Sequence, residues 1–469
     1  MLKNCTLLTR RFICLKPILL NKLHFKHSAT FINLLKNLPQ TQCSQLENGL
    51  TVATEERQSC NTCIGLYIDA GSRYESKSQN GITHFMEHVA FKSTKSRNTA
   101  VLENLILTTG AKFQCFTTRE MTAYFVECLS SDVPLVFDIL LDCIFNNALN
   151  YSVIESEKQI VCSEMFEHER NIKNILFDYL HLSAFQGTPL EQTVMGPSNN
   201  IFKFNAKLLC KLIYERFTPE KMVLTAIGGI NHHQIQDLAN KYLSKLVNVK
   251  VDESNKFRYT GSDIRYRDDS QPMAHVAIAF EGPSFSHDDY TIMELASAVV
   301  GGWDKSQLGG LGHGTRVARA ASYEGLCDAY KSFYISYKDT ALWGAYFIAP
   351  RLTLDDMVFV VQDEWMRLCT MITDEEIERA KNQLKTNLLS KSASVVETSH
   401  KIGRSILYRT CILPLYEAIM DIDNISSNDI KAVCYKYLYD KCPVVAAVGP
   451  TEALTDYSRI RSNTYWLRL

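Results

Sequence analysis

The sequence predicts an α/β protein built from two tandem domains of the same type. Its 469 residues are too many for one ordinary domain, so two or three are expected. Runs rich in β-branched and aromatic residues alternate with stretches of helical period, and the order in residues 41–247 recurs in residues 273–469. A hydrophobic content of 46% is ample for two large cores. No apolar run approaches the length of a membrane span.

Each element of the first domain follows from its local pattern. Strands are expected at the β-rich runs 50–53, 62–69, 112–116, 123–129 and 222–229. Helices are expected at 133–145, where Pro134 suits the first turn, and at 154–169. The polar residues 117–120 separate two of the strands, which predicts a hairpin-like pair.

The second domain follows a predicted linker. Residues 248–272 are polar and charged without a sustained period, which is typical of a linker. Beyond it, strands are expected at 275–282, 340–349 and 443–449, and helices at 289–300, 357–369 and 374–389. The glycine-rich stretch 301–314 lacks the Gly-Lys-Ser/Thr ending of a phosphate loop, so we interpret it as a flexible loop at the rim of a cleft.

Residues 1–40 are interpreted as a mitochondrial transit peptide and N-terminal extension. Residues 1–46 hold seven Lys and Arg among Leu, Phe and Ile, with no Asp or Glu. This pattern is typical of a transit peptide, whereas a secretory signal needs an uninterrupted apolar core. A disordered basic tail is the alternative. Removing residues 1–28 would change the formal net charge from −1 to −7, because six basic and no acidic residues leave with them. An acidic protein attracts cationic ligands.

Other compositional features exclude some functions. The cysteines of a protein in the mitochondrial matrix are expected to be reduced thiols. Cys60 and Cys63 form a lone Cys-x-x-Cys pair, which we interpret as incidental because no second pair accompanies it. Basic residues beyond the N-terminus are scattered, so no nucleic-acid partner is predicted.

The chemistry is expected in residues 81–91. His84 and His88 are four residues apart, so on a helix both imidazoles face one metal ion. Glu87 lies beside the second histidine, where its carboxylate could act as a general base next to a Lewis acid, as hydrolysis of a peptide bond requires. The alternative is two core histidines flanking a capping glutamate. Such a cluster is costly to bury on an apolar helix without a metal or partners.

A catalytic zinc ion needs a third protein ligand and an open position. The acidic stretch 155–170 holds the best candidates. Glu157 and Glu164 are seven residues apart, two helical turns, and so share a face. Spacing alone does not choose a ligand from this stretch.

These residues resemble the pitrilysin-type inverzincin metallopeptidase family. His84, Glu87 and His88 are followed by Glu164, 76 residues after the second histidine. Within the family, the chain is similar to the branch of the mitochondrial processing peptidase beta subunit and the core 1 protein of respiratory complex III. The resemblance runs from about Thr41 to the C-terminus and rests also on residues 68–75, 177–181, 342–346, 364–369, 446–450 and 460–468. It implies two homologous domains, each a mostly antiparallel sheet flanked by helices, of which only the first is catalytic.

The resemblance also implies a role for each site residue. The zinc ligands that it implies are His84, His88 and Glu164. It makes Glu87 the general base and Glu157 a second acid that helps to hold and tune the site. Residues 113–118 match the edge strand to which substrates of the family add as an extended strand.

The chain departs from that branch in its substrate-binding residues. Gln114 and Cys115 stand where the branch usually has Asn-Ala. Asn174 and Asp178 stand where the processing peptidase holds a substrate arginine with a Glu and an Asp. A guanidinium prefers a carboxylate to an amide by about 1–2 kcal/mol, so this pocket is expected to be weaker for arginine.

The expected function is that of a zinc metalloendopeptidase subunit that removes presequences from proteins imported into mitochondria. In this branch the glycine-rich substrate-presenting loop belongs to a catalytically inactive alpha subunit, so a heterodimer in the matrix is expected. The alternative is a structural core 1 subunit of complex III, paired with a core 2 protein on the matrix side of the inner membrane, and both roles can coexist. A third reading is a tissue-restricted paralogue with shifted specificity, which Gln114 and Asn174 suggest.

Overall fold

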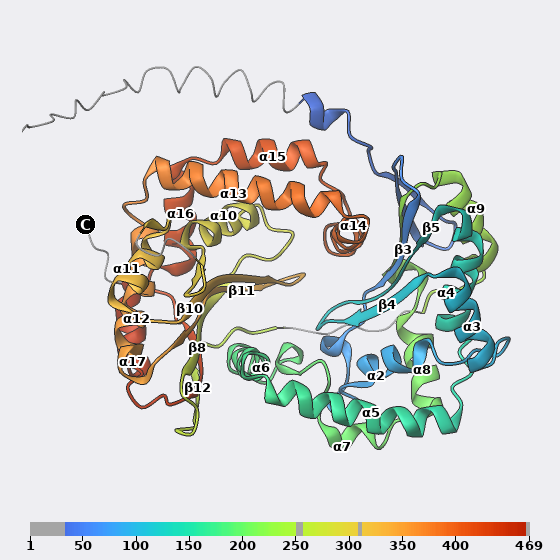
Figure 1. The fold of residues 1–469 in the computed structure, drawn as a ribbon, viewed down its shortest axis with the longest axis horizontal. Coiled ribbons are helices and arrows are strands. Elements are labelled where there is room, and N and C mark those ends of the chain that lie inside the picture. Colours follow the sequence, from blue (N-terminus) through green and yellow to red (C-terminus); the bar gives the residue numbers. More distant parts are fainter. Residues whose placement is uncertain (1–32, 250–256, 308–311, 466–469) are drawn as a thin grey trace, which may run out of the picture.

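The computed structural model describes residues 33–249, 257–307 and 312–465. Residues 1–32 of the predicted transit peptide and N-terminal extension, and the centre of the glycine-rich stretch, therefore lie outside the described residues. Two six-stranded sheets stand apart from each other, each with helices on its outer face, and helices α6 and α14 lie between them (Figure 1). This arrangement confirms the predicted α/β fold with two tandem domains.

The first sheet has the strand order β1-β2-β6-β3-β5-β4. β2 and β6 are parallel and all other neighbours are antiparallel. Its strands are β1 (Gln42–Gln45), β2 (Thr51–Glu56), β3 (Asn61–Ile68), β4 (Lys112–Thr117), β5 (Thr122–Leu129) and β6 (Met222–Gly228). Every strand expected in this domain is present, and β1 was not expected.

Helices cover the outer face of this sheet because the apolar side of each helix packs against apolar side chains of the strands. Phe137 and Leu140 of one helix and Ile235 of another are buried in one core with Leu66 and Val126 of the strands. The helices of this half are α2 (Ile82–Ala90), α3 (Thr99–Thr109), α4 (Val133–Phe145), α5 (Tyr151–Arg170), α6 (Ile172–Ala184), α7 (Ser198–Ile201), α8 (Ala206–Arg216) and α9 (His232–Leu243).

The second sheet has the strand order β7-β12-β8-β11-β10-β9. Its strands are β7 (Asp263–Arg267), β8 (Ala274–Gly282), β9 (Gly302–Asp304), β10 (Ala329–Ser336), β11 (Ala341–Ala349) and β12 (Val444–Gly449). The helices of this half are α10 (Tyr290–Val300), α11 (Arg316–Glu324), α12 (Leu354–Leu368), α13 (Asp374–Ala393), α14 (Val395–Arg409), α15 (Leu415–Asn424), α16 (Ser427–Leu438) and α17 (Tyr457–Ser462).

The structure contradicts the prediction in two segments of this half, and β10 and the helices α11, α14, α15, α16 and α17 were not expected. Residues 263–267 were expected to belong to a linker but form β7, which pairs in parallel with β12. The strand lies at the edge of the sheet and none of its residues is buried, so its sequence is polar and carries no strand signal. Residues 302–304 of the glycine-rich stretch form β9, which pairs with β10. That part of the stretch is therefore not a flexible loop.

The two sheets repeat one pairing pattern. The series β2-β6-β3-β5-β4 and the series β7-β12-β8-β11-β10 each begin with one parallel pair and continue antiparallel. They differ at the far edge. In the second sheet β9 pairs with the outer edge of β10. In the first sheet β4 stands in the place of β10, and no further strand lies beside it among the described residues. The first sheet therefore keeps an open edge, as expected for residues 113–118.

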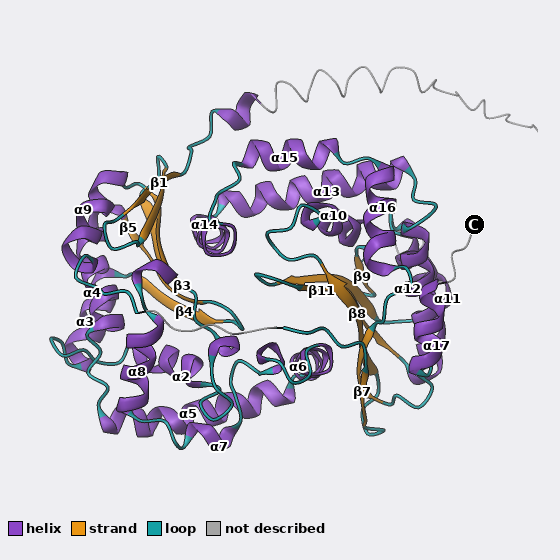
Figure 2. Ribbon diagram, turned by 180° about the vertical axis from the view of Figure 1, so that it is seen from behind, coloured by secondary structure: helices purple, strands orange, loops and turns teal. Residues whose placement is uncertain are grey.

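One helix of each half packs on the sheet of the other half. α14 of the second half packs on β3 and β6, while α6 of the first half packs on β12 and β8 (Figure 2). Ser399 of α14 lies 2.8 Å from the Tyr67 hydroxyl and 2.7 Å from the Thr225 hydroxyl. Leu176 and Leu180 of α6 are buried in one cluster with strand residues of the second sheet. The halves are thus interlocked by these two helices.

Buried charges join the halves at a second place. Arg73 binds Glu120 of the first half at 2.5 Å and Asp339 of the second half at 2.7 Å. The backbone N–H of Lys338 donates to the same Glu120 carboxylate at 3.0 Å. The turn after β4 is thereby fixed to the turn between β10 and β11.

Two further properties concern the environment of the chain. None of the helices in the described ranges is long and apolar enough to cross a membrane. The cysteines in these ranges, Cys60 and Cys63 included, are all free thiols.

Candidate metal centre and substrate cleft

The helix that carries the metal motif is fixed at both ends by side chains from elsewhere. Glu75 accepts hydrogen bonds from the backbone N–H groups of Gly81, at 2.7 Å, and Thr83, at 2.8 Å. It thereby satisfies N–H groups that a helix start leaves free and complements the helix dipole. At the other end, the Asn147 amide donates to the carbonyl groups of Val89 and Ala90 at 3.0 Å each.

The start of α2 requires a glycine. Gly81 has φ +97°, and a Cβ atom there would lie 2.2 Å from the Met195 carbonyl oxygen. Because of this close approach, the loop around residue 195 lies against the metal helix. Phe85, Met86 and Val89 are buried on the packed side of the helix. The polar residues of the motif are left on the opposite side.

The structure brings together the three predicted metal ligands. One ligand atom from each of His84, His88 and Glu164 lies within 4.8 Å of the other two. Nε2 of His88 is 2.8 Å from Oε2 of Glu164, and Nε2 of His84 is 3.4 Å from the same oxygen. Glu164 comes from α5, which packs beside α2.

These donor atoms fit a metal ion. Nε2 of His84 and Oε2 of Glu164 are buried and, apart from each other and the His88 ring, have no polar partner among the described residues. Buried polar atoms without partners are rare, because each costs free energy. Two imidazole nitrogens and one carboxylate oxygen are a donor set typical of catalytic zinc.

The charges of the three groups are coupled. Burial alone would lower the pKa of His84, but the carboxylates of Glu164 and Glu87 outweigh it and raise that pKa to about 9. The two imidazoles in turn hold the pKa of Glu164 well below its usual range. The Glu164 carboxylate is therefore ionised beside a protonated His84. A divalent metal cation could take the place of that proton.

The two remaining acids of the prediction flank this centre. Oε2 of Glu87 lies 3.6 Å from Nδ1 of His84, and its side chain is 18% exposed. Oε2 of Glu157 lies 3.8 Å from Nδ1 of His88, while its other oxygen pairs with Lys92 at 2.9 Å. Glu87 thus faces the cleft, whereas Glu157 is buried behind the histidine.

A cavity of about 1510 Å³ opens beside the centre. His84 and Glu87 line it, together with Phe116 and Thr117 of the edge strand β4. Its wall continues along α6 and reaches residues of the second half, namely Tyr266, Asp268, Gln271 and Val448. The cleft is therefore built by both halves of the chain.

Of the predicted substrate-binding residues, only two line this cavity. Asn174 and Asp178 do so from α6. Gln114 is exposed on β4, and Cys115 turns toward the metal helix, where its Sγ lies 3.6 Å from the Glu87 carbonyl oxygen. These two residues lie on the open edge strand but outside the cavity wall.

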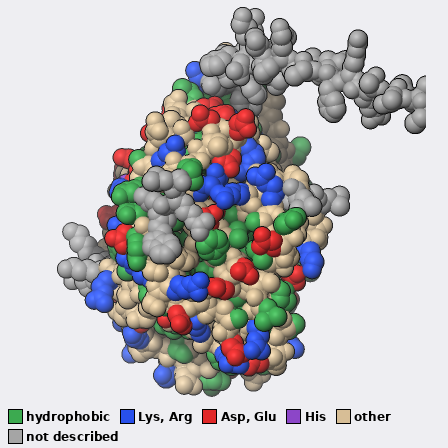
Figure 3. All heavy atoms as spheres, turned by 90° about the vertical axis from the view of Figure 1, so that its left-hand side faces the viewer, with side chains coloured by type: hydrophobic (Ala, Val, Ile, Leu, Met, Phe, Trp, Pro, Cys, Tyr) green, Lys and Arg blue, Asp and Glu red, His purple; other side chains and the backbone are tan. Residues whose placement is uncertain are grey.

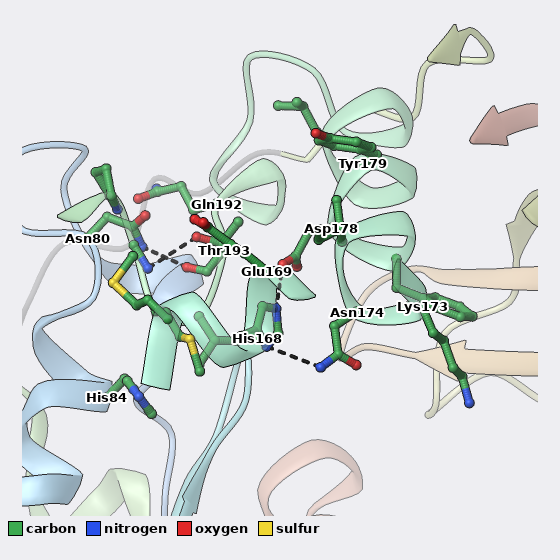
Figure 4. A pocket seen from close by; sticks show the side chains of 18 of the residues that line it. Asn80, His84, His168, Glu169, Lys173, Asn174, Asp178, Tyr179, Gln192 and Thr193 are labelled. Atoms are coloured by element: carbon green, nitrogen blue, oxygen red, sulfur yellow. Dashed lines mark hydrogen bonds and ion pairs between the residues drawn. The ribbon is translucent and has the colours of Figure 1, made fainter. Parts of the chain in front are cut away.

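Several residues of the site were given no role by the sequence analysis. His168 and Arg119 line the cavity and contact Asp178, as Figure 4 shows for His168. The helix clamps Glu75 and Asn147 and the ion-pair partner Lys92 were missed as well. A signal existed for His168 alone, because it lies four residues after Glu164 and so on the same face of α5.

The comparisons with known protein families agree with this geometry. Residues 51–198 match the family model described as Insulinase (Peptidase family M16), and residues 203–384 match the Peptidase M16 inactive domain. The chain belongs to peptidase family M16. The half that holds the candidate metal centre matches the first of these models, and the half without it matches a domain described as inactive.

Two groups of M16 relatives are similar to nearly the whole chain. Cytochrome b-c1 complex subunit 1 of Mus musculus is 42% identical over 96% of this chain and 95% of its own. Mitochondrial-processing peptidase subunit beta of Bos taurus is 40% identical over 95% of this chain and 91% of its own. The recognised branch is confirmed, and its two members are matched to nearly the same degree.

Solved structures have the same fold. A chain of complex III2 from Candida albicans superposes with a TM-score of 0.81 at 25% identity, covering 90% of this chain and 99% of that chain. A protease from Helicobacter pylori superposes with a TM-score of 0.79 at 18% identity, covering 88% of this chain and all of its own. The latter likeness concerns the fold alone.

Proposed function

We propose that the chain is the catalytic subunit of a zinc metalloendopeptidase that removes N-terminal presequences from proteins imported into mitochondria. The observation that carries the proposal is the convergence of His84, His88 and Glu164 at the cleft, with buried donor atoms that lack other partners. The similarity to mitochondrial-processing peptidase subunit beta supports it.

The residues divide the work of hydrolysis. His84, His88 and Glu164 would hold zinc, which when bound supplies a Lewis acid that polarises the scissile carbonyl and acidifies water. Glu87, at the cleft side of the centre, takes the proton of the attacking water and gives it to the leaving amine. Glu157 lies behind the His88 ring with Oε2 3.8 Å from Nδ1, where its carboxylate would help to orient the ring and keep Nε2 turned toward the ligand cluster.

The edge strand offers the means of holding a peptide. β4 has no strand on its outer side among the described residues, and two of its residues line the cavity beside Glu87. A peptide that adds to this edge as an extended strand gains main-chain hydrogen bonds that do not depend on its sequence. Such binding suits presequences, whose sequences differ from protein to protein.

The proposal includes a partner and a location. The relatives named above are subunits by name and mitochondrial by name. We infer that the chain acts in mitochondria, on the matrix side, in a heterodimer with a catalytically inactive alpha-type subunit. Full activity of the isolated chain on presequence peptides would contradict the need for that partner.

A second candidate function is a structural one. The similarity to subunit 1 of the cytochrome b-c1 complex and to a chain of complex III2 favours a core 1 subunit that pairs with a core 2 protein. The two functions are compatible in one chain. Migration with complex III on a native gel distinguishes an assembly subunit from a free peptidase.

The substitution Glu87→Gln tests the proposed chemistry. It removes the base but keeps the size of the side chain, so zinc should stay bound while cleavage of a presequence peptide falls by a factor of about 100 or more. Zinc content and cleavage are measured on the chain purified with an alpha-type partner, and Glu167→Gln, at a 68% exposed side chain of α5, serves as the control. Undiminished turnover in Glu87→Gln would rule out Glu87 as the base.

A further inference from the structure

A chain of hydrogen bonds crosses the wall of the cleft between α5 and α6. Nη2 of Arg119 donates to Oδ1 of Asp178 at 2.6 Å, and Nε2 of His168 lies 3.1 Å from Oδ2 of the same carboxylate. The other ring nitrogen of His168, Nδ1, lies 3.3 Å from the amide nitrogen of Asn174. Figure 4 shows His168 between Asp178 and Asn174. We call Arg119, His168, Asn174 and Asp178 the α5–α6 subsite.

One tautomer of His168 satisfies every member of this chain. With its hydrogen on Nε2, the ring donates to Asp178 and accepts the amide hydrogen of Asn174 on Nδ1. Both oxygens of Asp178 are then engaged by protein donors. The side-chain amide oxygen of Asn174, Oδ1, receives no hydrogen bond from a described residue. It is therefore the acceptor that the subsite offers to a substrate.

The negative charge of the subsite is compensated within the protein. Burial would raise the pKa of Asp178, but His168 and Arg119 outweigh it and lower that pKa, so the carboxylate stays ionised next to a fixed guanidinium. The charged side chains that line the whole cavity nearly balance as well. The basic ones are Lys77, Arg119, Arg170 and Lys173, and the acidic ones are Glu87, Glu169, Asp178, Glu191 and Asp268.

The position of the subsite defines which substrate residue it contacts. His168 lies four residues after the metal ligand Glu164 on α5, which places it about 6 Å along the helix. An extended peptide advances about 3.3 Å per residue. The subsite therefore lies close enough to the metal centre to contact a substrate side chain near the bond that is cut.

We propose that His168 determines the specificity of this subsite by closing the Asp178 carboxylate to substrate cations. An arginine that entered would have to displace His168 from Oδ2 and would meet the positive charge of Arg119. An uncharged side chain with a donor, such as glutamine, instead meets the free carbonyl oxygen of Asn174. The substrates are thus presequences with an uncharged polar residue near the cut, and this inference rests on the proposed peptidase function.

Peptide binding tests the inference without cleavage. The zinc-loaded Glu87→Gln chain, purified with an alpha-type partner, is titrated with fluorescent presequence peptides whose cut site has first been mapped with the wild-type chain. The residues within two positions of the cut are varied among Arg, Gln and norleucine. We expect the Arg peptides to bind no more tightly than the Gln peptides. Tighter binding of Arg peptides would overturn the proposal.

A second variant isolates the role of His168. Adding His168→Ala frees one oxygen of Asp178, so the ratio of Arg to Gln affinity should shift about tenfold toward arginine. His233→Ala, at an exposed position of α9, should leave the ratio unchanged. An unchanged ratio in His168→Ala would overturn the role of His168. Should that variant fail to fold, Asn174→Glu, which adds a carboxylate, is expected to give the same shift, and its failure to do so would count equally against the proposal.

The outcomes also separate this inference from the proposed function. Cleavage by the wild-type chain together with a preference for arginine overturns the subsite and leaves the peptidase intact. If the wild-type chain cuts no peptide, the peptidase is contradicted; Arg, Gln and norleucine are then placed in turn at each position of one presequence peptide, and an Arg-to-Gln affinity ratio that rises in His168→Ala still supports the subsite. If no peptide binds the zinc-loaded complex, both are overturned.

Discussion

At the scale of single residues, the order of contacts around His88 explains why two acids of one helix have different roles. Glu164 and Glu157 lie two turns apart on α5 and both approach this imidazole. Glu164 meets Nε2 of the ring at 2.8 Å, whereas Glu157 is buried on the Nδ1 side and pairs with Lys92. The first is therefore placed to bind metal and the second to orient the ring.

This difference predicts the effect of Glu157→Gln. The amide removes the negative charge that lies 3.8 Å from Nδ1 of His88, and loss of such an outer partner weakens metal binding by a factor of about 10–100. Zinc affinity is measured by competition with a chelator. Glu155→Gln, on the same helix, should bind zinc as the wild type does. Equal affinity in Glu157→Gln and in the control would show that the acid does not orient the ligand.

At the scale of elements, the metal helix is a short one whose position depends on its neighbours. Its two ends are bound by Glu75 and Asn147, which lie in other segments of the chain. A nine-residue helix is marginal by itself, so these contacts and its buried side decide where the histidines lie.

The substitution Glu75→Ala should loosen that helix. It leaves the N–H groups of Gly81 and Thr83 without their acceptor, at a cost of about 1–3 kcal/mol. We expect a lower unfolding temperature and weaker zinc binding, measured on the same preparation by calorimetry and chelator competition. Lys77→Ala, at a largely exposed side chain of the same loop, is the control. A normal zinc affinity in Glu75→Ala would show that the clamp does not position the ligands.

At the scale of the whole molecule, the packing of α6 and α14 on the sheet of the opposite half joins the two halves around the cleft. The outer face of the second half mixes basic, acidic and apolar side chains (Figure 3). The inner surfaces, in contrast, are buried by α6 and α14. Because the cavity wall includes residues of both halves, its shape depends on these two helices.

Gly403 of α14 tests this dependence. A Cβ atom there would lie 2.4 Å from the ring of Tyr67, which is fully buried in the first sheet. Gly403→Val should therefore push α14 off the sheet and lower the unfolding temperature by several degrees, with new protease cuts near the ends of α14. Lys401→Ala, at an exposed position of the same helix, should change neither. Wild-type stability of Gly403→Val would contradict the close packing.

Local features of the chain could be predicted from its sequence, and long-range ones could not. The i, i+4 spacing of His84 and His88 placed two ligands on one helix face, and strands such as β3, β5 and β6 were found because most of their residues are buried. The sequence period does not say which sheet a helix covers, so the exchange of α6 and α14 was not foreseen. The edge strand β7 was missed because its residues are polar.

The site shows the same limit. Spacing on α5 left Glu157 and Glu164 equivalent, and only the resemblance distinguished them, since the direction of each carboxylate depends on α2 beside it. Asn174 and Asp178 were identified as pocket residues. Arg119 and His168 both bind the Asp178 carboxylate because the segment after β4 and the end of α5 come close to α6. Local sequence patterns do not encode this long-range approach.

Chelation tests whether a metal held by His84, His88 and Glu164 is needed to cut presequences. The chain, purified with an alpha-type partner, is incubated with a panel of presequence peptides before chelation, after it, and after zinc is restored, and the products are mapped by mass spectrometry. We expect a defined cut that disappears with the metal and returns with zinc. A zinc-loaded complex that cuts no peptide of the panel would contradict it and favour the structural role.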